Sequence, residues 1–131
     1  MILTIDFQSE IPIYQQIRAA VVAEIAAGRV KTGEKLPPIR TLANELKVNL
    51  HTVNKAYQQL EQEELIKLLG RRGAIVGEPS ITDMQQTKKN LQQAVTEAVA
   101  YGLGYPELQK VVQQTCQRLK EGELIESHPG D

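Results

Sequence analysis

Residues 36–60 constrain the fold most, because two short amphipathic helices follow each other there with almost no linker. The apolar residues of each helix are spaced i, i+3, i+4 and i+7. They are Ile39, Leu42, Ala43 and Leu46 in the first helix, and Val53, Ala56, Tyr57 and Leu60 in the second. The first helix is predicted to begin at the Pro37-Pro38 pair, and the second after Asn49, whose side chain can cap it. This layout is typical of a helix-turn-helix.

In a helix-turn-helix the start of the second helix enters the major groove of DNA. The side chains predicted to face outward there can all form hydrogen bonds with base edges or phosphates. They belong to Asn49, His51, Thr52, Asn54 and Lys55. The alternative for this stretch alone is an ordinary helical hairpin with a polar outer face.

A β-hairpin is predicted directly after the helix pair. The β-prone runs 65–69 and 74–76 are separated by Gly70-Arg71-Arg72-Gly73, which suits a tight turn. In this place the hairpin would be a wing, whose arginines can enter the minor groove or hold phosphates. Taken alone, the turn is equally well explained as a solvated loop. Together with the helix pair, it favours DNA binding.

Charge is distributed unevenly along the 131 residues, although the net charge is only −1. Residues 29–72 carry nine Lys or Arg and five Glu, a net charge of +4, whereas residues 81–131 carry a net charge of −2. Such an asymmetry suits a DNA-facing part joined to a part that does not face DNA.

The sequence contains few features of an enzyme, a metal-binding protein or a membrane protein. Cys116 is the only cysteine, and His51 and His128 lie in different regions, so no nucleophile–base pair, metal site or cofactor is expected, and no enzyme. Without a signal sequence or a membrane-length apolar run, we expect a cytoplasmic protein.

The N-terminal part is expected to form an arm over residues 1–8 that packs Phe7, and then a helix. Ser9 and Pro12 resemble the cap and first turn of a helix, and Gly28 is suited to end one. The sequence therefore predicts a helix over 10–27, followed by a turn over 31–35.

Two more helices are predicted over residues 83–101 and from Pro106 to about Glu121, joined by a turn. A two-helix hairpin of this size is marginal alone, so we expect it to pack against the same hairpin of a second subunit. The alternative is that it folds back on helix 10–27 in a monomer. The predicted organisation is a winged helix-turn-helix domain over 1–78, a dimerisation hairpin over 79–123 and a disordered tail over 124–131, in a mainly α fold with one small β-hairpin.

With these motifs identified, the chain resembles the GntR family of bacterial transcriptional regulators, and most closely its YtrA-type branch. The matching motifs run through residues 6–77. They are Pro12-Ile13-Tyr14-Gln15-Gln16-Ile17, Gly33-Glu34-Lys35-Leu36-Pro37, Arg40-Thr41-Leu42-Ala43, Val48-Asn49, Thr52-Val53, Ala56-Tyr57, Leu60-Glu61, Leu65-Ile66, Gly73 and Val76.

The resemblance implies a winged helix-turn-helix repressor that binds a two-fold DNA operator as a homodimer, often near a transporter operon. Base reading is assigned to Arg40, Asn49, His51 and Thr52, and backbone or minor-groove contacts to Lys55, Arg71 and Arg72. The chain departs from the family pattern at several positions, which leaves the operator sequence open: Pro38, Lys47, Leu50, His51, Glu64 and Arg71-Arg72. The alternative function is a winged-helix module that binds protein.

A small-molecule effector could bind at the dimer interface, between the C-terminal hairpins or between them and helix 10–27. Tyr14, Tyr101 and Tyr105 are candidates to line such a site, although their simpler interpretation is as core or interface residues. An effector-free repressor controlled by its own concentration is the other alternative.

Overall fold

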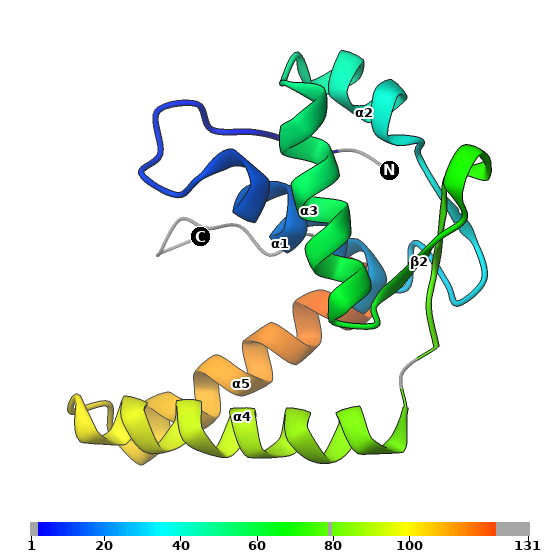
Figure 1. The fold of residues 1–131 in the computed structure, drawn as a ribbon. Coiled ribbons are helices and arrows are strands. Elements are labelled where there is room, and N and C mark those ends of the chain that lie inside the picture. Colours follow the sequence, from blue (N-terminus) through cyan, green and yellow to red (C-terminus); the bar gives the residue numbers. More distant parts are fainter. Residues whose placement is uncertain (1–2, 79, 123–131) are drawn as a thin grey trace.

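A computed structural model describes residues 3–78 and 80–122, so the tail predicted over 124–131 lies outside the described residues. A winged helix-turn-helix unit contains helices α1 (Ile13–Ala26), α2 (Ile39–Leu46) and α3 (Leu50–Gln62) with a small sheet. Below it in Figure 1 extends a hairpin of α4 (Ile81–Ala100) and α5 (Tyr105–Lys120). The predicted fold class is confirmed.

Helix α1 begins three residues later than the sequence predicts. The Ser9 hydroxyl accepts a hydrogen bond from the Ile11 N–H at 3.1 Å, so it closes a local turn, and Pro12 takes the position before the helix. At the other end Gly28 adopts a φ of 75° and ends the helix as predicted. The prediction that Phe7 packs is wrong, because its side chain is 62% exposed on a turn.

The core lies where α1, α2 and α3 meet the inner face of the sheet. Helix α3 contributes four residues to it, since the side chains predicted for its apolar face are all fully buried: Val53, Ala56, Tyr57 and Leu60. Ile17 and Val21 of α1 lie against this face with no exposed surface. The guanidinium of Arg18 and the carboxylate of Glu63 form a two-pronged ion pair that joins α1 to the end of α3.

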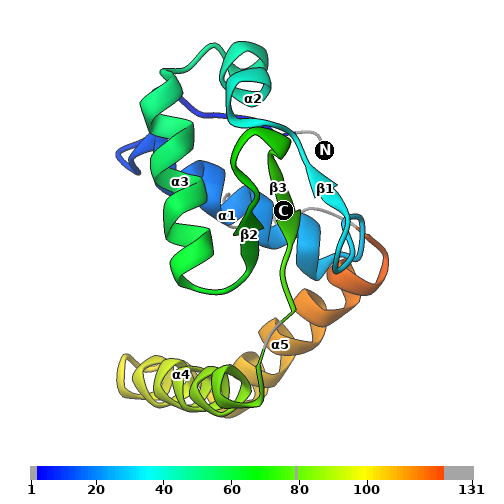
Figure 2. The ribbon, with the colours of Figure 1, turned by 45° about the vertical axis from the view of Figure 1, so that its right-hand side comes forward.

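The sheet has three antiparallel strands, one more than the sequence predicts. Strands β2 (Ile66–Leu68) and β3 (Ala74–Val76) form the expected hairpin, and β1 (Lys35–Leu36) pairs with the free edge of β3. The sequence predicts only a turn over 31–35, because two residues are too few to show a strand periodicity. Figure 2 shows the sheet in front of α1 and beside α3.

Two left-handed residues set the ends of α2 and α3. Lys47 has a φ of 58° after α2, and Glu64 has a φ of 64° after α3. Glycine would adopt this conformation at less cost than either residue. Helix α3 ends at Gln62, and Glu64 then redirects the chain into the wing.

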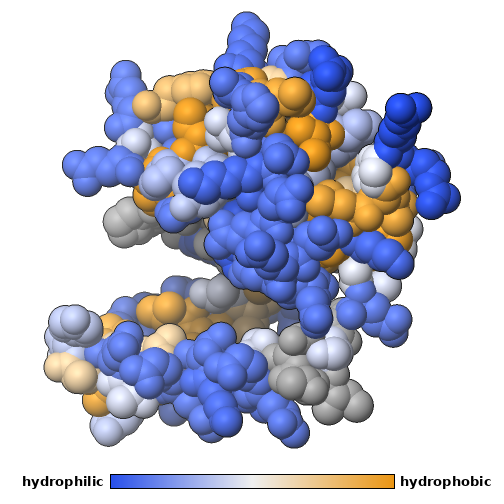
Figure 3. All heavy atoms as spheres, in the orientation of Figure 1, coloured by the Kyte–Doolittle hydropathy of each residue, from blue (hydrophilic) through white to orange (hydrophobic). Residues whose placement is uncertain are grey.

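The hairpin of α4 and α5 packs on itself and leaves much of its apolar surface exposed. Gly102, with a φ of 103°, ends α4 at the predicted place. Leu91 is 61% exposed, and Val111 and Val112 are 46% and 47% exposed. In Figure 3 hydrophilic side chains cover the outward surface of α3, and apolar surface appears on the hairpin below. No helix in the described part of the chain is long and apolar enough to cross a membrane.

Candidate nucleic-acid interface

The turn between α2 and α3 has the short, rigid geometry that a helix-turn-helix requires. The Lys47 and Val48 N–H groups bond back to carbonyls of α2, and Asn49 then begins α3. The Asn49 side-chain oxygen accepts the His51 N–H at 2.8 Å, which confirms the predicted N-cap. The first turn of α3 is thereby held at a fixed angle to α2.

The residues predicted to read bases lie at the starts of these two helices. Arg40 is exposed in the first turn of α2, and Asn49 and His51 are exposed at the start of α3. Thr52 is half-buried beside them. Because the cap uses the Asn49 oxygen, its amide NH₂ is the part of that side chain left for a base or phosphate.

Lys55 has a protein contact that the sequence did not indicate. Its ammonium nitrogen lies 4.0 Å from the centre of the Tyr14 ring of α1. A cation over an aromatic face is attracted by the ring. Tyr14 therefore positions Lys55 at the surface of α3, and is half-buried against the core on its other side.

The wing tip is a single turn of 3₁₀ helix over Gly70–Arg72 that displays both arginines. The Leu69 N–H donates to the Gly73 carbonyl at 2.7 Å and closes the tip. Gly70 and Gly73 both have positive φ, so their lack of a Cβ permits this tight path. Arg71 and Arg72 are exposed.

The wing is also fastened to α3 by a bond that no sequence pattern revealed. The Glu61 carboxylate accepts the Leu68 N–H at 2.7 Å. This N–H points away from β3 on an edge strand and would otherwise lack a partner in the sheet. A charged acceptor makes the bond strong, so α3 and the wing are held together.

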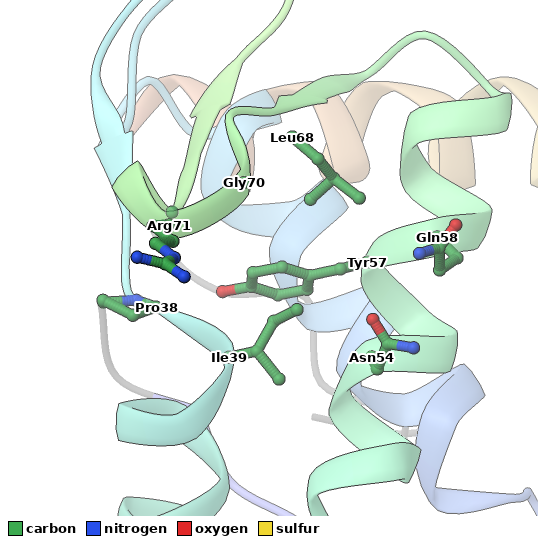
Figure 4. A pocket seen from close by; sticks show the side chains of 9 residues that line it. Pro38, Ile39, Asn54, Tyr57, Gln58, Leu68, Gly70 and Arg71 are labelled. Atoms are coloured by element: carbon green, nitrogen blue, oxygen red, sulfur yellow. The ribbon is translucent and has the colours of Figure 1, made fainter.

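A hollow of about 280 Å³ lies between the start of α2, the outer side of α3 and the wing. Its lining residues are Pro38, Ile39, Asn54, Tyr57, Gln58, Leu68, Gly70, Arg71 and Gly73. In Figure 4 the Arg71 side chain extends from the wing toward Pro38 and the hydroxyl end of Tyr57. The wing, α3 and the start of α2 therefore form one concave surface.

Asn54 and Gln58 join the candidate interface: the sequence predicts that Asn54 faces outward but gives it no separate role, and it does not single out Gln58. Both are in the hollow, one helical turn apart on α3. The signal for them was their i, i+4 spacing on the face opposite the buried side chains. That spacing also fits a solvated helix face. Only the position of the wing beside these two residues indicates that they belong to a binding surface.

Tyr57 fixes the floor of this hollow. Its hydroxyl donates to the Pro37 carbonyl at 2.7 Å and thereby joins α3 to the start of α2. Burial, with a smaller contribution from Glu45, raises the pKa of the Tyr57 hydroxyl well above its usual range. The side chain therefore acts as a neutral donor.

No group of three or more His, Cys, Asp or Glu side chains suited to a metal ion occurs among the described residues. The exposed Cys116 lies on α5, away from the helix pair and the wing. Of the three tyrosines considered for an effector site, Tyr101 and Tyr105 are 91% and 69% exposed. None of the three tyrosines lines the hollow between α2, α3 and the wing.

Comparisons with known proteins agree with this geometry. Residues 13–76 match the model of the bacterial regulatory proteins of the gntR family. The chain is 33% identical over 125 residues to the HTH-type transcriptional repressor YtrA of Bacillus subtilis, covering 92% of this chain and 96% of that protein.

Two solved structures extend the likeness to the arrangement of the elements. A transcriptional antiterminator from Listeria monocytogenes EGD-e superposes with a TM-score of 0.77 at 29% identity, covering 97% of this chain and 98% of the other. YtrA from Sulfolobus acidocaldarius, a GntR-family transcription factor, gives a TM-score of 0.57 at 39% identity, covering 72% and 99%. Fold, interface and relatives together lead to one conclusion: this chain belongs to the GntR family and is a DNA-binding transcriptional regulator.

Proposed function

We propose that the chain is a repressor that binds a two-fold DNA operator as a homodimer in the cytoplasm, through a winged helix-turn-helix domain over residues 1–78. The observation that carries the proposal is the concave surface formed by the starts of α2 and α3 and by the wing. A duplex in contact with the start of α3 would meet the wing arginines on one side. The regulatory names of the relatives support a role without catalysis.

The roles of individual residues form part of the proposal. Arg40, Asn49, His51 and Thr52 would read base edges from the starts of α2 and α3. Lys55, Arg71 and Arg72 would hold phosphates or the minor groove. Each base contact should contribute about 1–3 kcal/mol of discrimination, and each phosphate contact about 0.9 of a unit of salt slope.

The operator-binding proposal is tested with a fluorescent duplex from the promoter of the chain's own gene and a scrambled duplex of equal length. Titrations at two salt concentrations, followed by anisotropy, should show tighter binding to the promoter, steep salt dependence and two chains per site. Equal, weak and salt-insensitive binding to both duplexes would favour a winged helix that binds protein instead.

The residue roles are tested by comparing Arg40→Ala with Lys55→Ala. Loss of a base-reading arginine should reduce the preference for the promoter, whereas loss of a phosphate contact should weaken both duplexes alike. Equal losses on both duplexes for the two variants would contradict the assignment of Arg40.

Dimerisation is proposed through the hairpin over residues 79–123. The exposed apolar side chains of α4 and α5 support this, because an apolar surface of this kind is stabilised by burial against a second copy. Sedimentation equilibrium should find dimers of the unmodified chain and monomers of Leu91→Glu. The matched control is Lys88→Gln, one turn earlier on α4, which should remain a dimer. A monomeric unmodified chain would instead favour the alternative in which the hairpin folds back.

An effector, if the regulator has one, would bind between the two hairpins or between a hairpin and α1. The exposure of Tyr101 and Tyr105 leaves both available to such an interface. A ligand there could change the relative angle of the two recognition helices only by binding one dimer geometry better than the other. A screen of small molecules for changes in promoter affinity tests this, and an effector-free repressor would respond to none of them.

A further inference from the structure

The outer face of the sheet carries a basic surface that the proposed contacts of α2, α3 and the wing tip do not use. Lys35 on β1 and Lys67 on β2 both pair with Ile75 on the central strand β3. Residues directly opposite each other in antiparallel strands share one face, so the lysines flank Ile75 on the same side. Both are exposed, whereas their neighbours Leu36 and Ile66 are buried on the opposite face.

Charge is concentrated in this part of the chain. The segments 31–36 and 65–77, which form the sheet and its tip, contain five Lys or Arg and one Glu, a net charge of +4. The remainder of the chain therefore has a net charge of −5, since the total is −1. The one carboxylate, Glu34, accepts the Lys31 N–H at 3.0 Å within its own turn. Among the described residues, no ion pair involves Lys35 or Lys67.

The two sides of the wing face different directions. The inner side, with Leu68, Gly70 and Gly73, lines the hollow beside α3. The outer side, with the two lysines, faces away from that hollow. A duplex held by the start of α3 and the wing tip would therefore meet the outer side only where the duplex extends past the wing.

We propose that Lys35 and Lys67 bind the phosphate backbone of DNA that flanks the site contacted by α3 and the wing tip. This inference rests on the proposed function and adds a second, sequence-independent surface to it. Ile75 lies opposite both lysines on this face, where an apolar side chain suits the aliphatic stems of lysines whose ammonium groups stay at the surface. Phosphates are the ligands expected for two unpaired ammonium groups beside a surface that binds DNA.

A simpler explanation has to be separated from this one. β1 and β2 are the edge strands of the sheet, and lysines on edge strands prevent pairing with other chains. That role requires no DNA, and it predicts no effect of the lysines on binding. A binding measurement therefore distinguishes the two explanations.

The experiment compares the unmodified chain with the double variant Lys35→Gln, Lys67→Gln. Promoter and scrambled duplexes with long flanks are titrated at about 50 and 200 mM salt, where electrostatic contacts differ strongly. The salt slope should fall by about two units per bound protomer, which makes the loss of affinity about tenfold larger at the lower salt concentration. Both duplexes should be affected alike, because phosphate contacts carry no sequence information.

The matched control is Lys88→Gln, Lys89→Gln, which removes the same charge from exposed positions of α4. It should leave the slope unchanged, as should Lys35→Arg, Lys67→Arg, which keeps the charge on the sheet. A series of promoter duplexes with progressively shorter flanks locates the contact. When the flank becomes too short to reach the two lysines, the affinity of the unmodified chain for the duplex should fall in a distinct step. The affinity of the glutamine variant should show no such step.

The outcomes separate this inference from the proposed function. If the unmodified chain prefers the promoter but the glutamine variant has the same slope, the proposed function stands and the flank contact is wrong. A reduced slope that persists on the shortest duplex would also overturn the flank contact, since the lysines would then act within the central site. Failure of the unmodified chain to bind any duplex would overturn both.

Discussion

The ammonium nitrogen of Lys55 lies 4.0 Å from the centre of the Tyr14 ring, so α1 and the recognition helix α3 are joined by a cation–π contact. Lys55 is exposed and Tyr14 is half-buried, so the contact lies at the edge of the core. The attraction at such a site is about 0.5–1 kcal/mol. It orients a lysine that is proposed to hold a phosphate.

A double-mutant cycle measures this contact. Tyr14→Leu, Lys55→Gln and the double variant should give a coupling free energy of unfolding of about 0.5–1 kcal/mol in urea titrations. Tyr14→Leu alone should also weaken DNA binding slightly, because Lys55 becomes free to move. A coupling energy indistinguishable from zero would mean that the contact does not stabilise the fold.

Loss of the Glu61 carboxylate should loosen the wing. Glu61→Ala leaves the Leu68 N–H without its acceptor, and the expected loss of unfolding free energy is about 1–3 kcal/mol. Affinity for the promoter duplex should fall as well, because the wing arginines would be less well positioned. Glu61→Gln is the control. Its side-chain oxygen can still accept the Leu68 N–H, so its free energy of unfolding should lie between those of the unmodified chain and Glu61→Ala.

Asn49 has two separable roles, as the cap of α3 and as a proposed base contact. Asn49→Ala removes both and should cost about 1 kcal/mol of stability together with promoter preference. Asn49→Ser keeps a capping oxygen and loses the amide, so its stability should be close to that of the unmodified chain while its promoter preference still falls. Retention of that preference in the serine variant would remove Asn49 from the base-reading set.

Stability should decline at alkaline pH through Tyr57. An unfolded tyrosine ionises near pH 10, whereas burial raises the pKa of Tyr57 in the folded state. Below pH 10 the hydroxyl is neutral in both states. Above it the unfolded state loses its proton first, so the contribution of Tyr57 to stability decreases as the pH rises.

The comparison with Tyr57→Phe isolates this effect. At neutral pH the variant should be less stable by about 1 kcal/mol, because the bond to the Pro37 carbonyl is lost. Denaturant titrations above pH 10 should show the difference between the two proteins becoming smaller. A difference that stays constant with pH would contradict the raised pKa.

Lys47→Gly should stabilise the fold. Lys47 has a φ of 58° and a ψ of 43°, a left-handed conformation that costs a residue with a Cβ about 1 kcal/mol. Glycine removes most of that cost but loses more entropy on folding, so the net gain should be about 0.5 kcal/mol in urea titrations. Lys47→Ala keeps the Cβ and should show no gain, which excludes an effect of the lost charge.

The sequence by itself determined the helix pair, the wing and the C-terminal hairpin, because each depends on residues that are close together in the chain. The apolar spacing of α2 and α3, the cap at Asn49 and the glycines of the wing tip act within a few residues of one another. Such short-range preferences can be recognised from the sequence without knowledge of the tertiary structure. The resemblance to the family then predicted how these elements are arranged in one fold.

Tertiary structure alone decided the contacts that cross between elements. The pairing of β1 with β3, the position of Lys55 over Tyr14 and the bond from Leu68 to Glu61 join residues from different elements. The exposure of Phe7 was also decided there, since the core cluster forms from other residues. These features depend on how the helices and the sheet pack in three dimensions, and the spacing of residues along the chain does not encode that packing directly.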